Sequence, residues 1–250
     1  MALVLRNISK TFQKNTEPTL NNINLRIESG EFFCVVGKSG CGKSTLLNLI
    51  AGLSQPSSGN ITLNDMKING PGSDRVVMFQ EHALFPWLNV MKNVTFGMEL
   101  AGIKKEEREE RAMHYLKLVH LNGFEEYSIH QLSGGMKQRV ALARALSLDS
   151  EILLMDEPFS ALDKQTSNNL RIELQSIWQA TGKTIFFITH SVEEAVYLGD
   201  RVAIMSPDTH NIQEIITIQL DRPRHVYNDK FVEYRHQILR LVQGGTSEEY

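Results

Sequence analysis

The sequence has few cysteines, no excess of positive charge and no long apolar run. Each of these features argues against one class of protein. The two cysteines in 250 residues, Cys34 and Cys41, favour a reducing compartment over a disulfide framework. The formal net charge of −3 argues against a general affinity for nucleic acid, because that affinity requires a basic face. No apolar run approaches the roughly 20 residues that span a bilayer, and the start, MALVLR, lacks the pattern of a signal peptide. If the protein serves a membrane, we expect it to do so through a partner.

The distribution of apolar residues predicts an α/β domain. Alternating apolar and polar residues predict half-buried strands over residues 3–8 and 23–27. Short continuous apolar runs are typical of strands in a parallel sheet, and they occur at residues 32–36, 152–155, 185–188 and 202–205. The pattern predicts helices over residues 44–51, 162–179, 192–198 and 231–242.

The middle of the chain has a different character. Residues 89–120 have a helical composition, and the stretch from Lys104 to Arg111 is almost wholly charged. A charge run of this kind is typical of a solvated helix surface. We therefore predict a helical insert, over residues 88–148, within the α/β domain.

A glycine-rich stretch follows the apolar run that ends at Val36. It fits the phosphate-loop pattern G-x-x-x-x-G-K-S/T and reads Gly37, Lys38, Ser39, Gly40, Cys41, Gly42, Lys43, Ser44, followed by Thr45. Glycines allow successive backbone N–H groups to point at phosphate oxygens, and a following helix adds its positive N-terminal end. Lys43 would supply a positive charge and Ser44 a hydroxyl for Mg²⁺. The stretch predicts a site for the phosphates of a nucleotide.

Two acidic residues end the apolar run at 152–155. Asp156 and Glu157 would lie at the carboxyl edge of a parallel sheet, where open α/β folds bind their ligands. Asp156 is suited to hold the shell of Mg²⁺, and Glu157 to orient an attacking water. An acidic strand end is weak evidence alone, but beside a phosphate loop it predicts hydrolysis.

A third element lies between these two in the chain. It begins at Leu132 and reads Leu-Ser-Gly-Gly-Met-Lys-Gln-Arg. Ser133 and Gly135 offer a hydroxyl and a backbone N–H, and we expect the following helix over residues 140–146. This is a second helix N-terminus suited to an anion.

These three elements resemble those of the ABC ATPase family, and the resemblance covers nearly the whole chain. Phe12 stands where the family stacks an aromatic ring on adenine. Gln80 matches the glutamine that touches Mg²⁺ and senses the transmembrane partner, Asp163 lies in the D-loop, and His190 matches the switch histidine. Two residues depart from the common pattern, Ser191 after the histidine and Lys137 after the signature.

The resemblance implies a P-loop NTPase of the ABC ATPase type, an α/β fold with an N-terminal antiparallel β subdomain and a helical insert. Residues 1–250 would form a single ABC ATPase domain. Residues 1–87 and 149–250 would form the RecA-like core with the β subdomain. Residues 88–148 would form the helical subdomain that carries the signature motif.

The resemblance also implies a catalytic site shared between two subunits. ATP would lie on the phosphate loop of one subunit, and the signature residues of another would cover it, with Ser133, Gly134 and Gly135 acting in trans. Glu157 would polarise the water and His190 would act on the γ-phosphate in cis. Mg²⁺ would be held by Ser44, Gln80 and Asp156. We therefore expect a pair of ATPase subunits, either identical or related.

The length and several segments resemble the importers of this family. Only about 45 residues follow the predicted strand at 202–205, too few for the additional regulatory domain usual in sugar and polyamine importers. Segments 85–90, 155–163 and 221–224 are similar to those of the nitrate/sulfonate/taurine group. This resemblance implies a permease partner, an external substrate-binding protein and a peripheral position on the cytoplasmic membrane face. The transported substrate is not readable from the chain.

Two other functions compete with import. One is a non-transport ABC-type ATPase acting in a soluble complex, although no sustained heptad array or second cassette appears here. The other is a regulator that binds ATP without hydrolysing it, which the presence of both Glu157 and His190 disfavours.

Two residue-level hypotheses follow. Because Cys41 would be ringed by N–H groups near Lys43, we expect a more reactive thiolate than in a free cysteine; the alternative is an inert side chain that fills the loop. The apolar segment from Phe85 to Leu88 lies where the family docks a coupling helix of the membrane subunit. A partner-facing surface and simple packing inside the helical insert both remain open for it.

Overall fold

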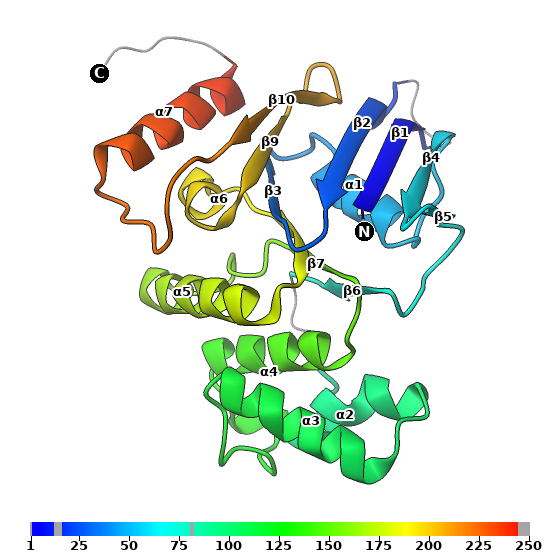
Figure 1. The fold of residues 1–250 in the computed structure, drawn as a ribbon, viewed down its shortest axis with the longest axis vertical. Coiled ribbons are helices and arrows are strands. Elements are labelled where there is room, and N and C mark those ends of the chain that lie inside the picture. The colour runs from blue at the N-terminus through cyan, green and yellow to red at the C-terminus, as the bar shows by residue number, and fades with distance from the viewer. Residues whose placement is uncertain (1, 13–16, 81–82, 245–250) are drawn as a thin grey trace. The chain divides into compact units, whose positions relative to one another are not determined.

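The computed structural model describes residues 2–12, 17–80 and 83–244, and the chain divides into two compact units (Figure 1). Unit 1 comprises Met1–Gly72 together with Lys183–Tyr250, and unit 2 comprises Ser73–Gly182. The chain therefore leaves unit 1, forms unit 2 and returns.

Unit 1 contains an antiparallel sheet in the strand order β2-β1-β4-β5. Its strands are β1 (Ala2–Lys10), β2 (Leu20–Glu28), β4 (Ser58–Leu63) and β5 (Met66–Lys67). Burial alternates along β2 from Ile23 onward, as expected for a sheet with one face in the core. The antiparallel β subdomain is thus confirmed. Its strands β4 and β5 lacked a clear signal, because residues 58–67 mix glycine and polar residues with few apolar ones.

A second group of strands in unit 1 carries the phosphate loop. The strands β3 (Phe32–Gly37), β8 (Thr184–Ile188) and β9 (Arg201–Met205) are parallel, with β3 paired to both of the others. The strand β10 (Ile212–Thr217) pairs antiparallel with β9. Every residue of β3 and β8 is buried, as predicted from their continuous apolar runs.

Three helices complete the description of unit 1. They are α1 (Lys43–Ile50), α6 (Val192–Leu198) and α7 (Asp229–Gln243). The helices α6 and α7 lie side by side (Figure 1). The helices expected over 44–51, 192–198 and 231–242 are therefore confirmed to within about two residues, the usual uncertainty of helix ends.

Unit 2 combines two parallel strands with a group of helices. The strands β6 (Arg75–Met78) and β7 (Ile152–Asp156) pair so that Met78 lies opposite Met155. The helices are α2 (Val90–Leu100), α3 (Lys105–Leu118), η1 (Ile129–Gln131), α4 (Gly134–Ser147) and α5 (Lys164–Thr181). Helix α4 packs against both α3 and α5 (Figure 1).

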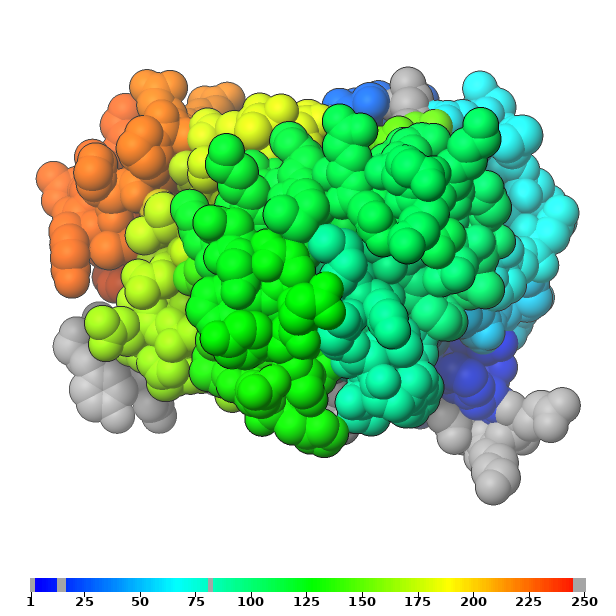
Figure 2. Space-filling view, turned by 90° about the horizontal axis from the view of Figure 1, so that it is seen from below, coloured from blue at the N-terminus to red at the C-terminus, as the bar shows by residue number. Residues whose placement is uncertain are grey.

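The charged run lies on the surface of unit 2, as predicted. Lys104 precedes α3, and most of the charged side chains from Lys105 to Arg111 are exposed on it. Figure 2 shows α2, α3 and the segment that follows α3 as a continuous teal to green surface. Helices α2 to α4 fall within residues 88–148, and the division into a helical subdomain over that range stays a prediction. Among the described residues, no helix is long and apolar enough to cross a membrane.

Candidate functional site

The phosphate loop lies between β3 and α1 in unit 1. Gly37 ends β3, and a Cβ there would lie 2.7 Å from the carbonyl oxygen of Met205. Gly42 is the N-cap of α1 with φ 98°, and a Cβ there would lie 2.7 Å from the carbonyl oxygen of Thr19. Both positions therefore require glycine. No side chain caps α1, so the N–H groups of its first turn remain for a ligand.

The lysine of the loop is held inside it. Lys43 is only 7% exposed, and its Nζ donates to the carbonyl oxygens of Gly37 (2.9 Å) and Lys38 (3.1 Å). Ser44, which follows it, is exposed and Thr45 is half-buried. A buried ammonium beside a helix N-terminus is a strong anion site. The geometry suits the β- and γ-phosphates expected here.

The rim of the loop is exposed. Lys38, Ser39 and Gly40 are all exposed, and Gly40 has φ 82°. The Lys38 Nζ donates to the carbonyl oxygen of Gln243 (3.1 Å), near the end of α7. The loop thus has a fixed inner half and an accessible outer half.

The expectation of a reactive thiolate at Cys41 is wrong. The Cys41 side chain is fully buried, and Lys43 Nζ lies 3.9 Å from its Sγ. Burial raises the pKa of the thiol, and the nearby lysine offsets this only in part. The side chain fills the loop, in agreement with the inert alternative.

Unit 1 also holds two of the isolated sequence candidates. Phe12 is 44% exposed, and Lys10 Nζ lies 5.0 Å from its ring centroid. This exposed ring is available for stacking. His190 is exposed and lies between β8 and α6.

In unit 2, pairing of β6 with β7 brings Gln80 to the turn that carries Glu157. Each residue lies two positions beyond the Met78–Met155 pair. Gln80 Nε2 donates to Ser160 Oγ (3.1 Å), and Ser160 Oγ donates to the carbonyl oxygen of Glu157 (2.9 Å). Glu157 itself has φ 45°, a backbone conformation that is costly for this residue type and is found at functional sites.

Each residue expected to hold Mg²⁺ offers an oxygen donor. Ser44 offers a hydroxyl, Asp156 a carboxylate at the end of β7, and Gln80 an amide oxygen. The Gln80 amide nitrogen is the atom engaged with Ser160, so its oxygen is the group suited to a cation. Oxygen ligands with one carboxylate match the preference of Mg²⁺ bound together with substrate phosphates.

The signature residues form the N-terminus of α4. Ser133 is the N-cap, and its Oγ accepts from Met136 N–H (3.3 Å). A Cβ at Gly135 would lie 2.7 Å from Thr166 Cγ2, so α4 approaches the start of α5 closely there. The prediction that the helix begins near residue 140 is wrong. It begins six residues earlier, because the serine cap and this close approach place Gly134 and Gly135 in its first turn.

The D-loop aspartate stabilises the next helix. Asp163 is the N-cap of α5 and accepts from Gln165 N–H (3.1 Å) and Thr166 N–H (3.0 Å). Its hydrogen bonds, foremost that from the Thr166 N–H, lower the pKa of this exposed carboxyl. Since Thr166 also approaches Gly135, the D-loop and the signature turn are adjacent in unit 2.

The apolar segment before α2 is only partly packed. Phe85 contacts Phe96 (ring centroids 4.4 Å apart) and Arg144 (5.5 Å). Trp87 is 76% exposed, so it does not pack inside the helical insert. The Trp87 ring lies beside that of Phe85 (centroids 5.5 Å apart), and an exposed tryptophan favours the partner-facing interpretation of this segment.

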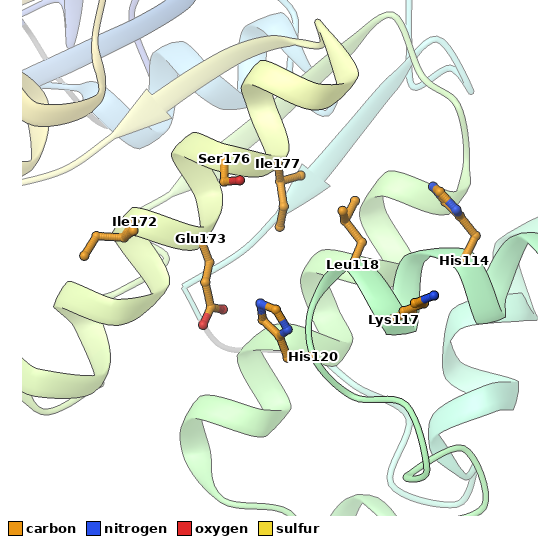
Figure 3. Close-up of a pocket in the computed structure, with 8 residues that line it drawn as sticks. All are labelled: His114, Lys117, Leu118, His120, Ile172, Glu173, Ser176 and Ile177. Carbon is orange, nitrogen blue, oxygen red and sulfur yellow. The ribbon is translucent and has the colours of Figure 1, made fainter. Parts of the chain in front are cut away.

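A pocket of about 570 Å³ opens between the C-terminal part of α3 and α5 in unit 2 (Figure 3). It is lined by His114, Lys117, Leu118, His120, Ile172, Glu173, Ser176 and Ile177. Glu173 extends from α5 toward His120 in this view and is ion-paired with Arg139 (2.7 Å). None of the lining residues is a predicted nucleotide residue, so this pocket is not the site that the sequence predicts.

Comparison with known proteins places these features in one family. The ABC transporter family model matches residues 20–160. An uncharacterized ABC transporter ATP-binding protein of Methanocaldococcus jannaschii is 52% identical over 243 residues, 96% of this chain and 91% of that protein. The nitrate import ATP-binding protein NrtD of Synechocystis is 45% identical over 260 residues, 100% of this chain and 98% of that protein. The taurine import ATP-binding protein TauB of Pseudomonas fluorescens is 44% identical over 251 residues, 97% of this chain and 95% of that protein.

Solved structures with a similar fold also belong to ATP-binding cassettes of ABC transporters. A dimeric ATP-binding cassette in a post-hydrolysis state, bound to ADP and Pi, matches with a TM-score of 0.75 and 32% identity, covering 88% of this chain and 100% of that one. The cbiO1 protein of Clostridium perfringens, part of an ABC transporter complex, matches with a TM-score of 0.81 and 27% identity, covering 97% of this chain and 96% of that one.

Proposed function

Because the chain belongs to the ABC transporter family, we propose that it is the ATP-binding subunit of an importer and hydrolyses MgATP at the interface of an ATPase dimer. The observation that carries the proposal is that one chain has two glycine-containing helix N-termini of the kind suited to phosphate. The first is the uncapped α1 behind the glycine loop, and the second is α4 behind Ser133. We infer that a single nucleotide uses both types of terminus, one from each of two subunits, and the similar dimeric cassette bound to ADP and Pi supports this inference.

The inner half of the phosphate loop binds and orients the triphosphate of the nucleotide. The N–H groups of the first turn of α1 and the ammonium of Lys43 neutralise the β- and γ-phosphates. Phe12 stacks on the adenine ring. Catalysis of phosphoryl transfer depends on positioning and charge stabilisation, so these contacts are the largest contribution from unit 1.

The remaining residues act on the water and on the γ-phosphate. Ser44, Gln80 and Asp156 would hold Mg²⁺, which would supply positive charge to neutralise the phosphates. Glu157 orients and polarises the attacking water, and His190 donates to the γ-phosphate. Ser133, Gly134 and Gly135 of the second subunit close the site, and Asp163 supports that closure. Hydrolysis then depends on dimer closure.

The dimer is tested with a variant that binds ATP without hydrolysing it. We expect Glu157→Gln to form an ATP-dependent dimer, measured by sedimentation with and without MgATP, because loss of the polarising carboxylate leaves the closed state intact. Glu151→Gln, an exposed glutamate just before β7, is the matched control and should hydrolyse ATP and remain monomeric at the same concentration. A Glu157→Gln protein that stays monomeric with ATP, even beside its permease, contradicts the proposal.

The permease is the partner that we infer for the segment from Phe85 to Leu88. Full-length similarity to the nitrate and taurine import proteins supports a nitrate/sulfonate/taurine-like substrate, a substrate-binding protein outside the membrane and a peripheral position on its cytoplasmic face. These same relatives support import over a non-transport role in a soluble complex. Co-purification of the chain with a permease subunit tests this choice directly.

The docking role is tested by comparing two exposed apolar side chains. Trp87 is 76% exposed and Leu100, also in unit 2, is 75% exposed. We expect Trp87→Ala to lower transport in reconstituted vesicles severalfold while basal hydrolysis is retained, since truncating a tryptophan at an interface hot spot costs about 2 kcal/mol or more, about 30-fold in binding. Leu100→Ala should affect neither activity. Equal loss of transport and hydrolysis in Trp87→Ala would point to damaged packing instead.

A further inference from the structure

The residues that flank His190 form a closed set of hydrogen bonds. The Thr189 hydroxyl donates to Glu194 Oε2 at 2.6 Å. The oxygen of that hydroxyl, Thr189 Oγ1, also accepts from Ser191 N–H at 3.0 Å. The Ser191 hydroxyl accepts in turn from Glu194 N–H at 3.3 Å. His190 therefore lies between two residues whose side chains are both tied to Glu194.

We call the three residues Thr189, Ser191 and Glu194 the bracket. Within it, the Glu194 carboxylate determines how the other hydrogen bonds are oriented. A threonine hydroxyl has one hydrogen, so donating it to Glu194 leaves the lone pairs of Thr189 for the Ser191 N–H. A bond from a hydroxyl to a carboxylate at 2.6 Å is short and charge-assisted. Thr189 is 2% exposed, and burial strengthens such a bond. The carboxylate thus sets the orientation of the hydroxyl and, through it, of the peptide between His190 and Ser191.

The same bracket is tied to the strand that carries the phosphate loop. Thr189 N–H donates to the carbonyl oxygen of Val35 at 3.1 Å. Two residues after Val35, β3 ends at Gly37, where the loop begins. Thr189 therefore connects the backbone of His190 both to Glu194 and to the entry of the phosphate loop.

We propose that Glu194 is a positioning residue for ATP hydrolysis, which holds His190 in register with the phosphate loop through the hydroxyl of Thr189. The inference rests on the proposed function, in which His190 acts on the γ-phosphate. A displacement of about 1 Å at a reacting group can cost on the order of 100-fold in rate. Loss of the bracket should therefore slow the chemical step and spare ATP binding.

The first test separates kcat from KM in steady-state phosphate release. We expect Glu194→Ala and Thr189→Val each to lower kcat by about 10- to 100-fold, with little change in KM for ATP. Thr189→Ser retains the hydroxyl and should retain most of the activity. The matched control is Glu193→Ala, which removes the same charge from the neighbouring position of α6, outside the bracket, and should hydrolyse ATP at close to the normal rate.

The second test asks whether Glu194 acts through His190. In a His190→Ala background, adding Glu194→Ala should lower kcat no further, because the group being positioned is already gone. Multiplicative losses overturn the proposal and assign Glu194 a general structural role. Thermal unfolding of each variant is measured alongside, and if Glu194→Ala does not fold, the Thr189→Val and Thr189→Ser pair is run in the same cycle.

The outcomes also distinguish this inference from the proposed function. If His190→Ala hydrolyses ATP at the normal rate, the proposed role of His190 fails and the inference fails with it. If His190→Ala is impaired while Glu194→Ala and Thr189→Val keep normal kcat, the proposed function stands and this inference alone is overturned.

Discussion

Two glycine-rich turns in this chain precede helices, yet they are built in opposite ways. The phosphate loop leads into α1, whose N-cap is Gly42 with no capping side chain. The signature turn leads into α4, whose N-cap is Ser133 with its hydroxyl engaged by Met136 N–H. The first keeps its N–H groups for a ligand, and the second satisfies one of them internally.

The difference indicates what each turn can do alone. The phosphate loop has a buried lysine and two glycines fixed by close approaches, so its anion site is complete within one unit. The signature turn exposes Ser133 and Gly134 and contributes a hydroxyl and N–H groups. We therefore expect the loop to control ATP binding and the signature turn to control closure and hydrolysis.

The largest effect should come from the loop. We expect Lys43→Ala to lower ATP hydrolysis by about 100-fold or more and to weaken ATP binding, because the ammonium compensates phosphate charge in a buried site. Phosphate release and calorimetric titration with ATP measure the two effects. Lys67→Ala, an exposed lysine on β5 in the same unit, is the control. If Lys43→Ala bound ATP normally, the phosphate loop would not control ATP binding, and the proposed difference between the two turns would be wrong.

A smaller effect should come from the signature turn. We expect Gly135→Ala to lower hydrolysis by about 10-fold and stability by about 1–3 kcal/mol, because the new methyl would overpack against Thr166 Cγ2, 2.7 Å away. ATP binding to the dilute monomer should not change. Thr166→Ser removes that methyl group, so the Gly135→Ala/Thr166→Ser double variant should regain most of the lost stability. If stability returns but hydrolysis does not, the methyl group blocks the nucleotide contact itself.

The sequence was sufficient for the phosphate loop and insufficient for the signature turn, for a physical reason. The run from Phe32 to Val36 and the glycines after it predicted β3, the loop and α1, because strand burial and glycine conformations are local properties. The start of α4 was misplaced because two adjacent glycines disfavour a helix by propensity. The cap by Ser133 is a local signal that the sequence offered, whereas the packing against Thr166 is distant in sequence and does not follow from it.

Contacts distant in sequence explain the other shortfalls. The reactivity of Cys41 was overestimated because its burial depends on the surrounding fold. The link from Gln80 through Ser160 to Glu157 joins residues 80 positions apart. Glu194 was passed over, although an acidic residue four positions after a strand-end histidine is a readable feature.

The next prediction is that alkylation has no effect, because Cys41 is packed inside the phosphate loop. We expect iodoacetamide near pH 7 to leave hydrolysis unchanged and Cys41 unmodified, because burial raises the pKa of the thiol and blocks access. Mass spectrometry of the native protein measures the modification. Protein unfolded in urea is the control, in which both Cys34 and Cys41 should react. Rapid loss of activity that MgATP prevents would restore the reactive thiolate and an open loop.

The smallest effect concerns Asp163, beside the signature turn. Hydrogen bonds from the N-terminus of α5 lower the pKa of its carboxyl, so the ionised form stabilises the fold. This contribution is complete above the unfolded pKa, about 4, and is lost as pH falls through the lower folded pKa. Asp163→Asn keeps a capping oxygen but not the charge, so its Tm should lie slightly below that of the wild type at pH 6, and the difference should shrink progressively as the pH falls below about 4. Asp221→Asn, exposed on a loop, is the matched control. A Tm difference that persists unchanged at pH 3 would mean that Asp163 stabilises α5 through its shape and not through its charge. The region of the signature turn would then lack the electrostatic contribution that Lys43 makes to the phosphate loop.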